Sequence, residues 1–164
     1  MIDEVFGKLE HDGYAYMGKT IINVFGNECE LRLQINAEEG EDILPEQYEA
    51  YEYFIEKWDS IQLNILERIL KYYNCEEKGS YGPDDIDAFK EWWPEIETIN
   101  ELKDFLHIDT IIIPEDFIME NMGGRGVYVL FNRDWGGEDY DDNGIAVSVV
   151  NECVNEVGYK DIAY

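Results

Sequence analysis

The chain has 164 residues, enough for one domain with a sizeable buried core. Its 38 acidic residues against 12 basic ones give a formal net charge of −26, which argues against nucleic acids and anionic membranes as partners because both are polyanions. The same charge favours a basic protein or cations, and the 45% hydrophobic content argues against disorder.

Cysteine usage and the first residues predict a cytoplasmic protein. Cys29, Cys75 and Cys153 are widely spaced and odd in number, so they predict neither a disulfide framework nor a zinc site. The sequence MIDEVFGKLEHDG lacks the basic and apolar regions of a signal peptide. Apolar runs reach only about five residues, far short of the roughly 20 that a membrane span needs.

The first predicted element is a β-hairpin over residues 14–37. Residues 14–25 are rich in β-branched and aromatic side chains, and residues 28–37 alternate between apolar and polar side chains. This alternation is the period of a half-buried strand. Gly26 and Asn27 between the two stretches favour a tight turn.

A long amphipathic helix is predicted next, over residues 45–74. Apolar side chains recur there at spacings of three and four, and Pro45 suits the first helical turn. The length is large for a domain of this size, so we expect a bend near Asp59 and Ser60.

Two short helices are predicted over residues 84–106. Asp84 and Asp85 favour the positive end of a helix that Pro94 terminates. Thr98 and Glu101 have the spacing of a capping box, which opens the second helix.

The last part of the chain predicts a sheet over residues 108–160. An apolar strand at 108–113 ends at Pro114, and the stretches GVYVLFN, GIAVSVV and CVNEVGY predict three further strands in a meander. We therefore expect a single α+β domain. Its mostly antiparallel sheet carries one long and two short helices packed on one face.

Residues 13–20, GYAYMGKT, match the phosphate-loop pattern G-x-x-x-x-G-K-[ST]. A phosphate loop needs a buried strand before it and a helix after it, whereas the residues after Thr20, IINVF, are typical of a strand. Three bulky side chains also occupy the loop positions. We interpret the stretch as part of the sheet, with a tight turn at residues 17–19, and predict no nucleotide binding.

Residues 139–144, DYDDNG, match the first half of a calcium loop. Val150 stands where the bidentate acid belongs, so a hairpin loop turning at Asn143 and Gly144 explains the stretch better.

His11 and His107 have no metal-binding partner nearby in the sequence, and His107 suits the boundary of a helix or strand. No serine or cysteine lies in a nucleophile motif, so we expect no catalytic residue, cofactor or metal site.

Aromatic side chains among acids are typical of protein-binding hot spots. Trp135 lies in a polar, glycine-rich stretch and is the best candidate for an exposed anchor. Trp92 and Trp93 are neighbours on a helix and cannot both point fully inward. The predicted partner-binding residues are Trp135, Glu138, Asp139, Tyr140, Asp141, Asp142, Asp84, Asp85, Trp92 and Trp93.

One set of residues forms a pattern along nearly the whole chain. It comprises Phe6-Gly7, Tyr16 with Gly18, Phe25-Gly26, Gln47-Tyr48 with Ala50-Tyr51, and the ending EVGYKDIA at residues 156–163. With this pattern the chain resembles a family of small uncharacterised bacterial proteins, a domain of unknown function. The family's usual Trp-Asp-Glu-x-x-Gly turn, often with a histidine, is replaced here by Trp135 and a longer acidic insert. No role for that histidine carries over.

The resemblance implies no activity. The leading hypothesis is a non-enzymatic, acidic protein-binding module that neutralises a basic partner, and immunity proteins of bacterial toxins offer an analogy. One alternative is a metal-dependent hydrolytic enzyme that uses the acidic loop 134–142 with His11. Another is a housekeeping protein whose charge only keeps it soluble.

Overall fold

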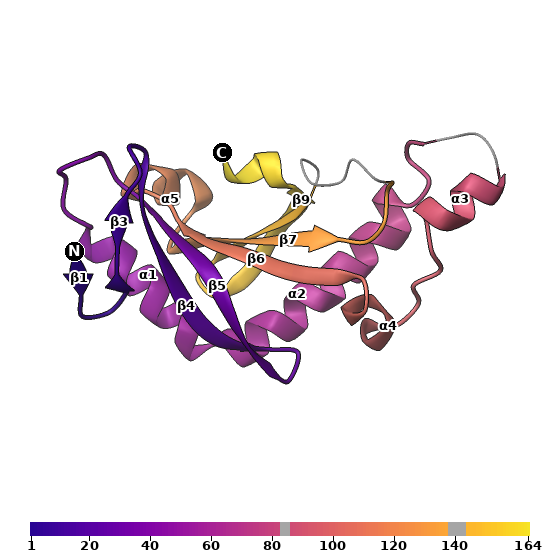
Figure 1. Cartoon of the computed structure of the whole chain (residues 1–164), viewed down its shortest axis with the longest axis horizontal. Helices are drawn as coiled ribbons and strands as arrows, with labels where there is room; N and C mark the ends of the chain where they lie inside the picture. The colour runs from indigo at the N-terminus through magenta and orange to yellow at the C-terminus, as the bar shows by residue number, and fades with distance from the viewer. Residues whose placement is uncertain (83–85, 138–143) are drawn as a thin grey trace.

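The computed structural model describes residues 1–82, 86–137 and 144–164. A seven-stranded sheet in the order β3-β4-β5-β6-β7-β8-β9 runs through the molecule (Figure 1). Its strands are β3 (Glu10–His11), β4 (Ala15–Val24), β5 (Asn27–Asn36), β6 (Leu106–Ile113), β7 (Gly126–Arg133), β8 (Ile145–Val150) and β9 (Cys153–Tyr159). A separate pair joins β1 (Ile2–Asp3) to β2 (Gly7–Lys8). The predicted α+β class with a mostly antiparallel sheet is confirmed.

One pair of neighbours departs from a meander. β5 and β6 are parallel, with Arg32 opposite Thr110, while the other neighbours in the large sheet are antiparallel. A parallel pair needs a crossover connection rather than a tight turn. Residues 37–105, which contain the main helices, make that connection.

The helical segments lie mostly in this crossover. They are α1 (Pro45–Glu56), α2 (Trp58–Tyr72), the π-helix η1 (Tyr73–Glu77), α3 (Ile86–Trp92), α4 (Ile99–Lys103), α5 (Asp116–Met122) and the 3₁₀-helix η3 (Lys160–Ala163). The helix predicted over 45–74 is therefore two helices. They divide at Lys57, whose φ of −100° and ψ of 9° are not helical, slightly before the expected bend. No helix in the described ranges is long and apolar enough to cross a membrane.

The main core lies between the sheet and the helices α1 and α2. Tyr51 and Phe54 of α1 and Ile61, Ile65 and Ile69 of α2 are buried against the strands. The strand residues in this core are Ile22, Val24, Leu31, Leu33, Ile35, Leu106, Ile111, Ile113, Val127, Val129, Phe131, Ile145, Val147 and Val149. Their alternate spacing puts them on one face of the sheet.

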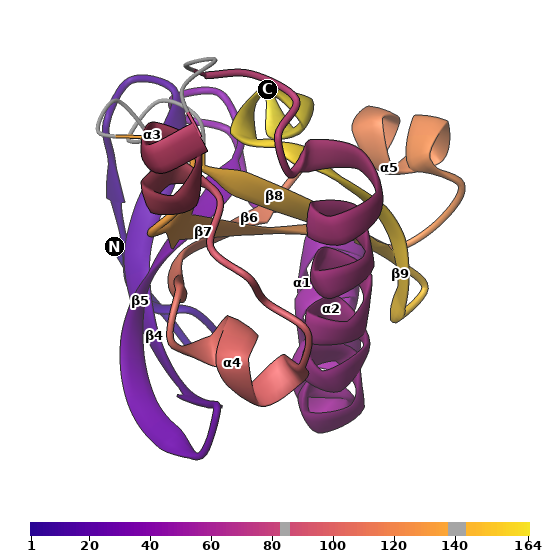
Figure 2. The ribbon, with the colours of Figure 1, turned by 90° about the vertical axis from the view of Figure 1, so that its right-hand side faces the viewer.

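A second, smaller core covers part of the opposite face. It contains Ile112, Tyr128, Leu130 and Ala146 of the strands. Side chains of α5 and η3 pack on it, and Figure 2 shows η3 on the side of the sheet away from α1 and α2. The central strands are therefore covered on both faces, which explains why their sequences are almost continuously apolar. The sequence patterns did not predict α5, a helix of seven residues.

The stretch GYAYMGKT lies mostly within β4. Gly18 pairs with Leu33 and Lys19 with Arg32 of β5, so the tight turn predicted at residues 17–19 is wrong. A Cβ atom on Gly18 would lie 2.6 Å from Leu9 Cδ2 and 3.0 Å from the Lys8 carbonyl oxygen. Because Leu9 is fully buried, the glycine permits close approach of the N-terminal segment to β4.

Two local predictions hold with small differences. The predicted β4–β5 hairpin is present, but its turn residues are Phe25 and Gly26, with φ angles of 54° and 90°, rather than Gly26 and Asn27. The Thr98 hydroxyl accepts a hydrogen bond from the Glu101 N–H at 3.2 Å, so Thr98 caps α4 as predicted. The second bond of a capping box is replaced, because the Glu101 carboxylate accepts the Thr98 hydroxyl and the Glu97 N–H instead of the Thr98 N–H. The carboxylates of Asp84 and Asp85, expected at the start of α3, lie outside the described residues.

Candidate functional site

The predicted partner-binding residues fall into two groups. Asp84, Asp85, Glu138, Asp139, Tyr140, Asp141 and Asp142 lie outside the described residues. Trp92, Trp93 and Trp135 are described, and the structure brings them together with Tyr73 and Tyr81. The ring centroids of Trp135 and Tyr73 are 4.9 Å apart, as are those of Trp93 and Tyr81. We call these five residues the tryptophan cluster.

Trp135 is the cluster residue whose burial differs most from the prediction. It was expected to be exposed, but only 1% of its surface is accessible, so that expectation is wrong. Its indole Nε1 donates to Glu77 Oε2 at 3.1 Å. The neighbouring Gly136 N–H donates to the Trp92 carbonyl oxygen at 2.7 Å, which fixes this loop against α3.

Trp92, the last residue of α3, and Trp93, which follows it, differ in burial, as expected for neighbours that cannot both point inward. Trp93 is buried, and its Nε1 donates to the Tyr81 carbonyl oxygen at 3.1 Å. Trp92 is half-buried, with its ring against Gly82 and Gly137, where an added Cβ would lie within 2.8 Å and 2.7 Å of the ring. A partner could therefore reach Trp92 and the 37%-exposed Tyr81 but not the other two indoles.

A buried ion pair lies beneath the tryptophan cluster. Arg133 Nη1 donates to Glu77 Oε1, and neither side chain is exposed. Arg133 Nη2 donates to the Tyr81 hydroxyl at 2.8 Å, and the guanidinium lies 5.1 Å from the ring centroid of Tyr159. Burial raises the pKa of Glu77, although the charge of Arg133 opposes this shift. Because the pair is closed to solvent, we assign it a structural role.

The two histidines have separate environments. His11 Nδ1 accepts the Gly13 N–H at 3.1 Å, so Nε2 carries the proton and donates to the Ala37 carbonyl oxygen at 2.9 Å. His11 lies on β3, four strands from β7 in the sheet order. The structure therefore does not bring His11 to Asp134, which directly follows β7.

His107 instead lies beside Asp134. Its Nε2 is 2.7 Å from Asp134 Oδ2, and both side chains are about half exposed. This pair was not predicted from the sequence, because it depends on the antiparallel register of β6 and β7. Within the described ranges, no group of three or more His, Cys, Asp or Glu side chains is placed to hold a metal ion.

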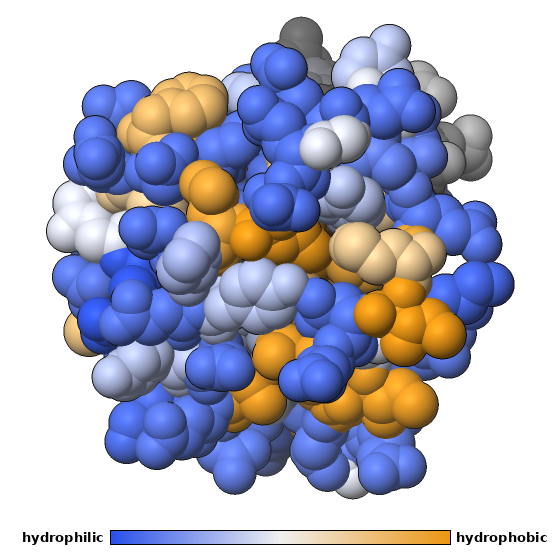
Figure 3. Space-filling model, turned by 90° about the vertical axis from the view of Figure 1, so that its left-hand side faces the viewer, coloured by the Kyte–Doolittle hydropathy of each residue, from blue (hydrophilic) through white to orange (hydrophobic). Residues whose placement is uncertain are grey.

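The end of the molecule formed by β1, α1 and α5 offers a mixed acidic and apolar surface, which we call the end face. Figure 3 shows it as mostly hydrophilic, with an apolar band across its middle. Met1, Ile2 and Val5 are exposed near β1, and Phe117 is exposed on α5. The acidic side chains Glu46, Glu49, Glu52, Asp116 and Glu120 are exposed on α1 and α5.

A groove of about 220 Å³ separates the two helices of the end face. Glu46 and Glu49 line it from α1, and Asp116 and Glu120 line it from α5. Arg125 is the basic side chain in the lining. Two hydrogen bonds of 2.8 Å and 3.1 Å tie its guanidinium to Glu152, so its charge is already compensated.

The sequence of residues 5–164 matches one protein-family model. The model of a domain of unknown function, DUF6985, matches residues 5–164. The chain belongs to the DUF6985 family. The resemblance to an uncharacterised family is thereby confirmed. Among curated proteins and solved structures, nothing matches the DUF6985 chain.

In the DUF6985 chain, residues that carried the resemblance hold the fold together. The Phe6 ring lies 4.9 Å from Tyr48 and 5.0 Å from Tyr51, between centroids. Gln47 is fully buried, and its side-chain oxygen accepts the Leu44 N–H at 3.0 Å. Its amide nitrogen donates to the carbonyl oxygens of Asn36 and Pro114. These contacts stabilise the start of α1 against the sheet.

The basic side chains of the DUF6985 chain are largely neutralised within the fold. At least seven of the 12 lie within ion-pair distance of a carboxylate. These pairs are Lys8–Glu10, Lys19–Glu30, Arg32–Asp109, Lys78–Glu95, Arg125–Glu152, Arg133–Glu77 and Lys160–Asp109. The remaining carboxylates are in large excess, so the surface presents uncompensated negative charge.

Proposed function

We propose that this DUF6985 chain is a non-enzymatic, cytoplasmic binding protein that recognises a basic protein, as an immunity protein neutralises a basic bacterial toxin. The observation that carries the proposal is the uncompensated negative charge. The net charge is −26, and most basic side chains already have a carboxylate partner. Such a surface steers a cationic partner and raises its association rate.

The end face supports the proposal because it combines an acidic rim with accessible apolar side chains. Ile2 is 87% exposed and Phe117 56% exposed, beside the acidic residues of α1 and α5. Apolar side chains surrounded by polar ones are the usual anatomy of a protein interface. The helices supply a fixed backbone, so little ordering is needed on binding.

The test uses the product of the gene adjacent to the chain's own, titrated by calorimetry at low and high salt. We expect the adjacent gene to encode a basic protein, and we expect its affinity for this chain to fall steeply as the salt concentration rises. Substituting Glu46, Glu49, Glu52 and Glu120 by Gln should weaken binding by about tenfold or more, because these acids lie on the end face.

The matched control substitutes Glu28, Glu67, Glu91 and Glu97 by Gln. These acids are also exposed and change the net charge equally, but they lie away from the end face. Equal weakening by both variants would contradict the end face as the binding surface. An adjacent gene product that is acidic, or that does not bind, would contradict the proposed function.

A further inference from the structure

The outer edge of β9 is open. β9 is the last strand in the sheet order, and no strand of the described residues pairs with its outer side. The side chain of Ile162 in η3 lies over Gly158, so the open part is Cys153–Val157. Unpaired backbone groups along a strand edge are a template for another extended chain.

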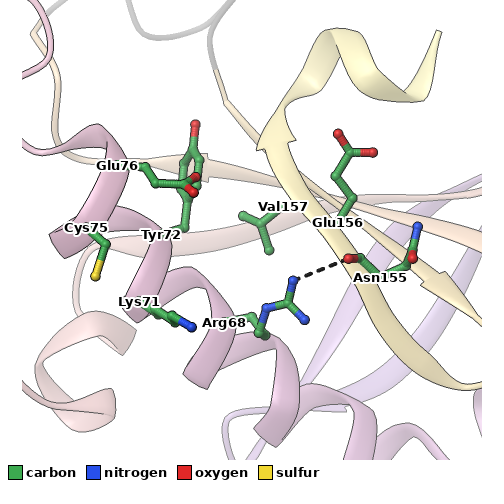
Figure 4. A pocket seen from close by; sticks show the side chains of 8 residues that line it. All are labelled: Arg68, Lys71, Tyr72, Cys75, Glu76, Asn155, Glu156 and Val157. Carbon is green, nitrogen blue, oxygen red and sulfur yellow. Dashed lines mark hydrogen bonds between the residues drawn. The ribbon is translucent and has the colours of Figure 1, made fainter.

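Helix α2 runs beside this edge and forms a groove with it. The α2–β9 groove measures about 480 Å³. Its lining residues are Arg68, Lys71, Tyr72, Cys75 and Glu76 on the helical side and Asn155, Glu156 and Val157 on β9. In Figure 4, Val157 points toward the helix and Glu156 points away from it. The groove therefore has a strand edge on one side and a helical wall on the other.

The Arg68 side chain hydrogen-bonds two carbonyl oxygens on the open edge of β9, and the backbone of an added strand could take its place. Its Nη1 donates to the Val154 carbonyl oxygen at 3.4 Å. Its Nη2 donates to the Asn155 carbonyl oxygen at 3.3 Å, the bond dashed in Figure 4. Both distances exceed the usual range of about 2.7–3.2 Å for N–H···O hydrogen bonds. These bonds are weak, and N–H groups of an incoming strand can take over the two carbonyl oxygens.

The charge of the groove differs from that of the rest of the surface. Arg68 and Lys71 lie one turn apart on α2 and point into the space between helix and strand (Figure 4). Neither forms an ion pair within the described ranges, whereas at least seven other basic side chains do. With Glu156 turned away, Glu76 is the opposing carboxylate in the lining. The groove thus favours an anionic side chain.

We propose that the α2–β9 groove binds an extended segment of a partner protein. The segment adds to β9 as an eighth strand and places an Asp or Glu side chain against Arg68 and Lys71. The open edge spans the five residues Cys153–Val157, with a β-bulge at Asn155, and a strand of that length measures at most about 17 Å, which limits the length of the segment. A second copy of the chain is a poor occupant, since each copy carries a net charge of −26.

The experiment selects ligands from a random dodecapeptide phage library on the wild-type protein. The double variant Arg68→Glu/Lys71→Glu serves as the counter-target. We expect a consensus in which β-branched residues alternate with polar ones that include an Asp or Glu. The synthetic consensus peptide should slow hydrogen exchange of the amides of residues 153–157. Its affinity should fall by about tenfold or more in the double variant.

The matched control is Lys57→Glu/Lys90→Glu, which changes the net charge equally at two exposed positions outside the groove. It should keep the affinity within about threefold. A peptide with N-methylated backbone amides should not bind. The proposal is overturned by the absence of a consensus or by equal loss in the control. Protection of residues 18–24 of β4, which β3 leaves unpaired, instead of β9 would also overturn it. A dimer with protected β9 amides would likewise overturn it in favour of self-association.

Discussion

Arg133 of β7 and Glu77 of η1 form an ion pair from which solvent is wholly excluded. The two residues are 56 positions apart, so the pair joins the end of the sheet to the end of the helical layer. Removing two charges from water is costly, and the cost is offset only while both charges remain together. The pair is therefore sensitive to the loss of either partner.

Glu77→Gln should destabilise the protein strongly. The substitution leaves the Arg133 charge buried without a counter-charge, which costs about 3–5 kcal/mol of unfolding free energy. Urea unfolding followed by tryptophan fluorescence measures the change. Glu76→Gln, at the exposed neighbouring position, should change stability by less than about 0.5 kcal/mol. A double replacement of Glu77 and Arg133 by Met should cost less than Glu77→Gln alone, and the opposite order would contradict this account.

Asp3 should make stability depend on pH in the acidic range. Burial alone raises the pKa of Asp3, but hydrogen bonds from the Tyr48 hydroxyl and the N–H groups of Phe6 and Val5 outweigh it and lower the pKa. Asp3 therefore contributes stability that is present above its ordinary pKa of 3.8 and is lost as the pH falls through the lower folded-state pKa.

Asp3→Asn should accordingly be less stable than wild type at neutral pH, with the difference shrinking on acidification. Urea midpoints over a series of acidic buffers measure it, with the exposed Glu4→Gln as control. A difference that stays constant down to the acid transition would count against the hydrogen-bonded role of Asp3.

Tyr48 should titrate unusually late. Burial, and then the 2.5 Å hydrogen bond to Asp3, raise the pKa of Tyr48 from 10.0 to about 12. Its contribution to stability is complete below the ordinary pKa and is lost as the pH rises toward the folded-state value. The phenolate absorbance of wild type minus that of Tyr48→Phe reports this titration, and Asp3→Asn should shift it to lower pH. An unshifted curve would disprove the coupling.

Gly18→Val should destabilise the N-terminal part of the sheet. The new side chain would displace Leu9, which a Cβ alone already meets at 2.6 Å, and overpacking of this kind costs about 1–3 kcal/mol. Lys19→Val, at the next and exposed position of β4, should be nearly neutral. Thermal melts compare the two. Equal stability of both variants would show that the Leu9 contact is unimportant.

The same stretch should not bind nucleotides. Gly18 and Lys19 lie within a β-ladder, so their backbone N–H groups do not converge at a helix N-terminus as phosphate binding requires. Calorimetry with ATP and with GTP should show no heat of binding. Binding that is lost in Lys19→Val would reverse this conclusion.

Local sequence signals predicted local structure well. The β4–β5 turn around Gly26 and the N-cap of α4 by Thr98 depend on residues a few positions apart, and both were predicted. Trp135 was misjudged because its flanks are polar, while its burial depends on Glu77, 58 positions away. The pair of His107 and Asp134 escaped prediction for the same reason.

The parallel pairing of β5 and β6 has a consequence for biosynthesis. The β4–β5 hairpin leaves the ribosome early, but the strand that pairs with its inner edge follows only after the whole helical crossover. Contacts between segments so distant in sequence form slowly, and an unpaired edge invites aggregation in the interval. We therefore expect the nascent chain to complete its sheet only after β6 emerges, and mutual repulsion of the acidic chains keeps them apart until then.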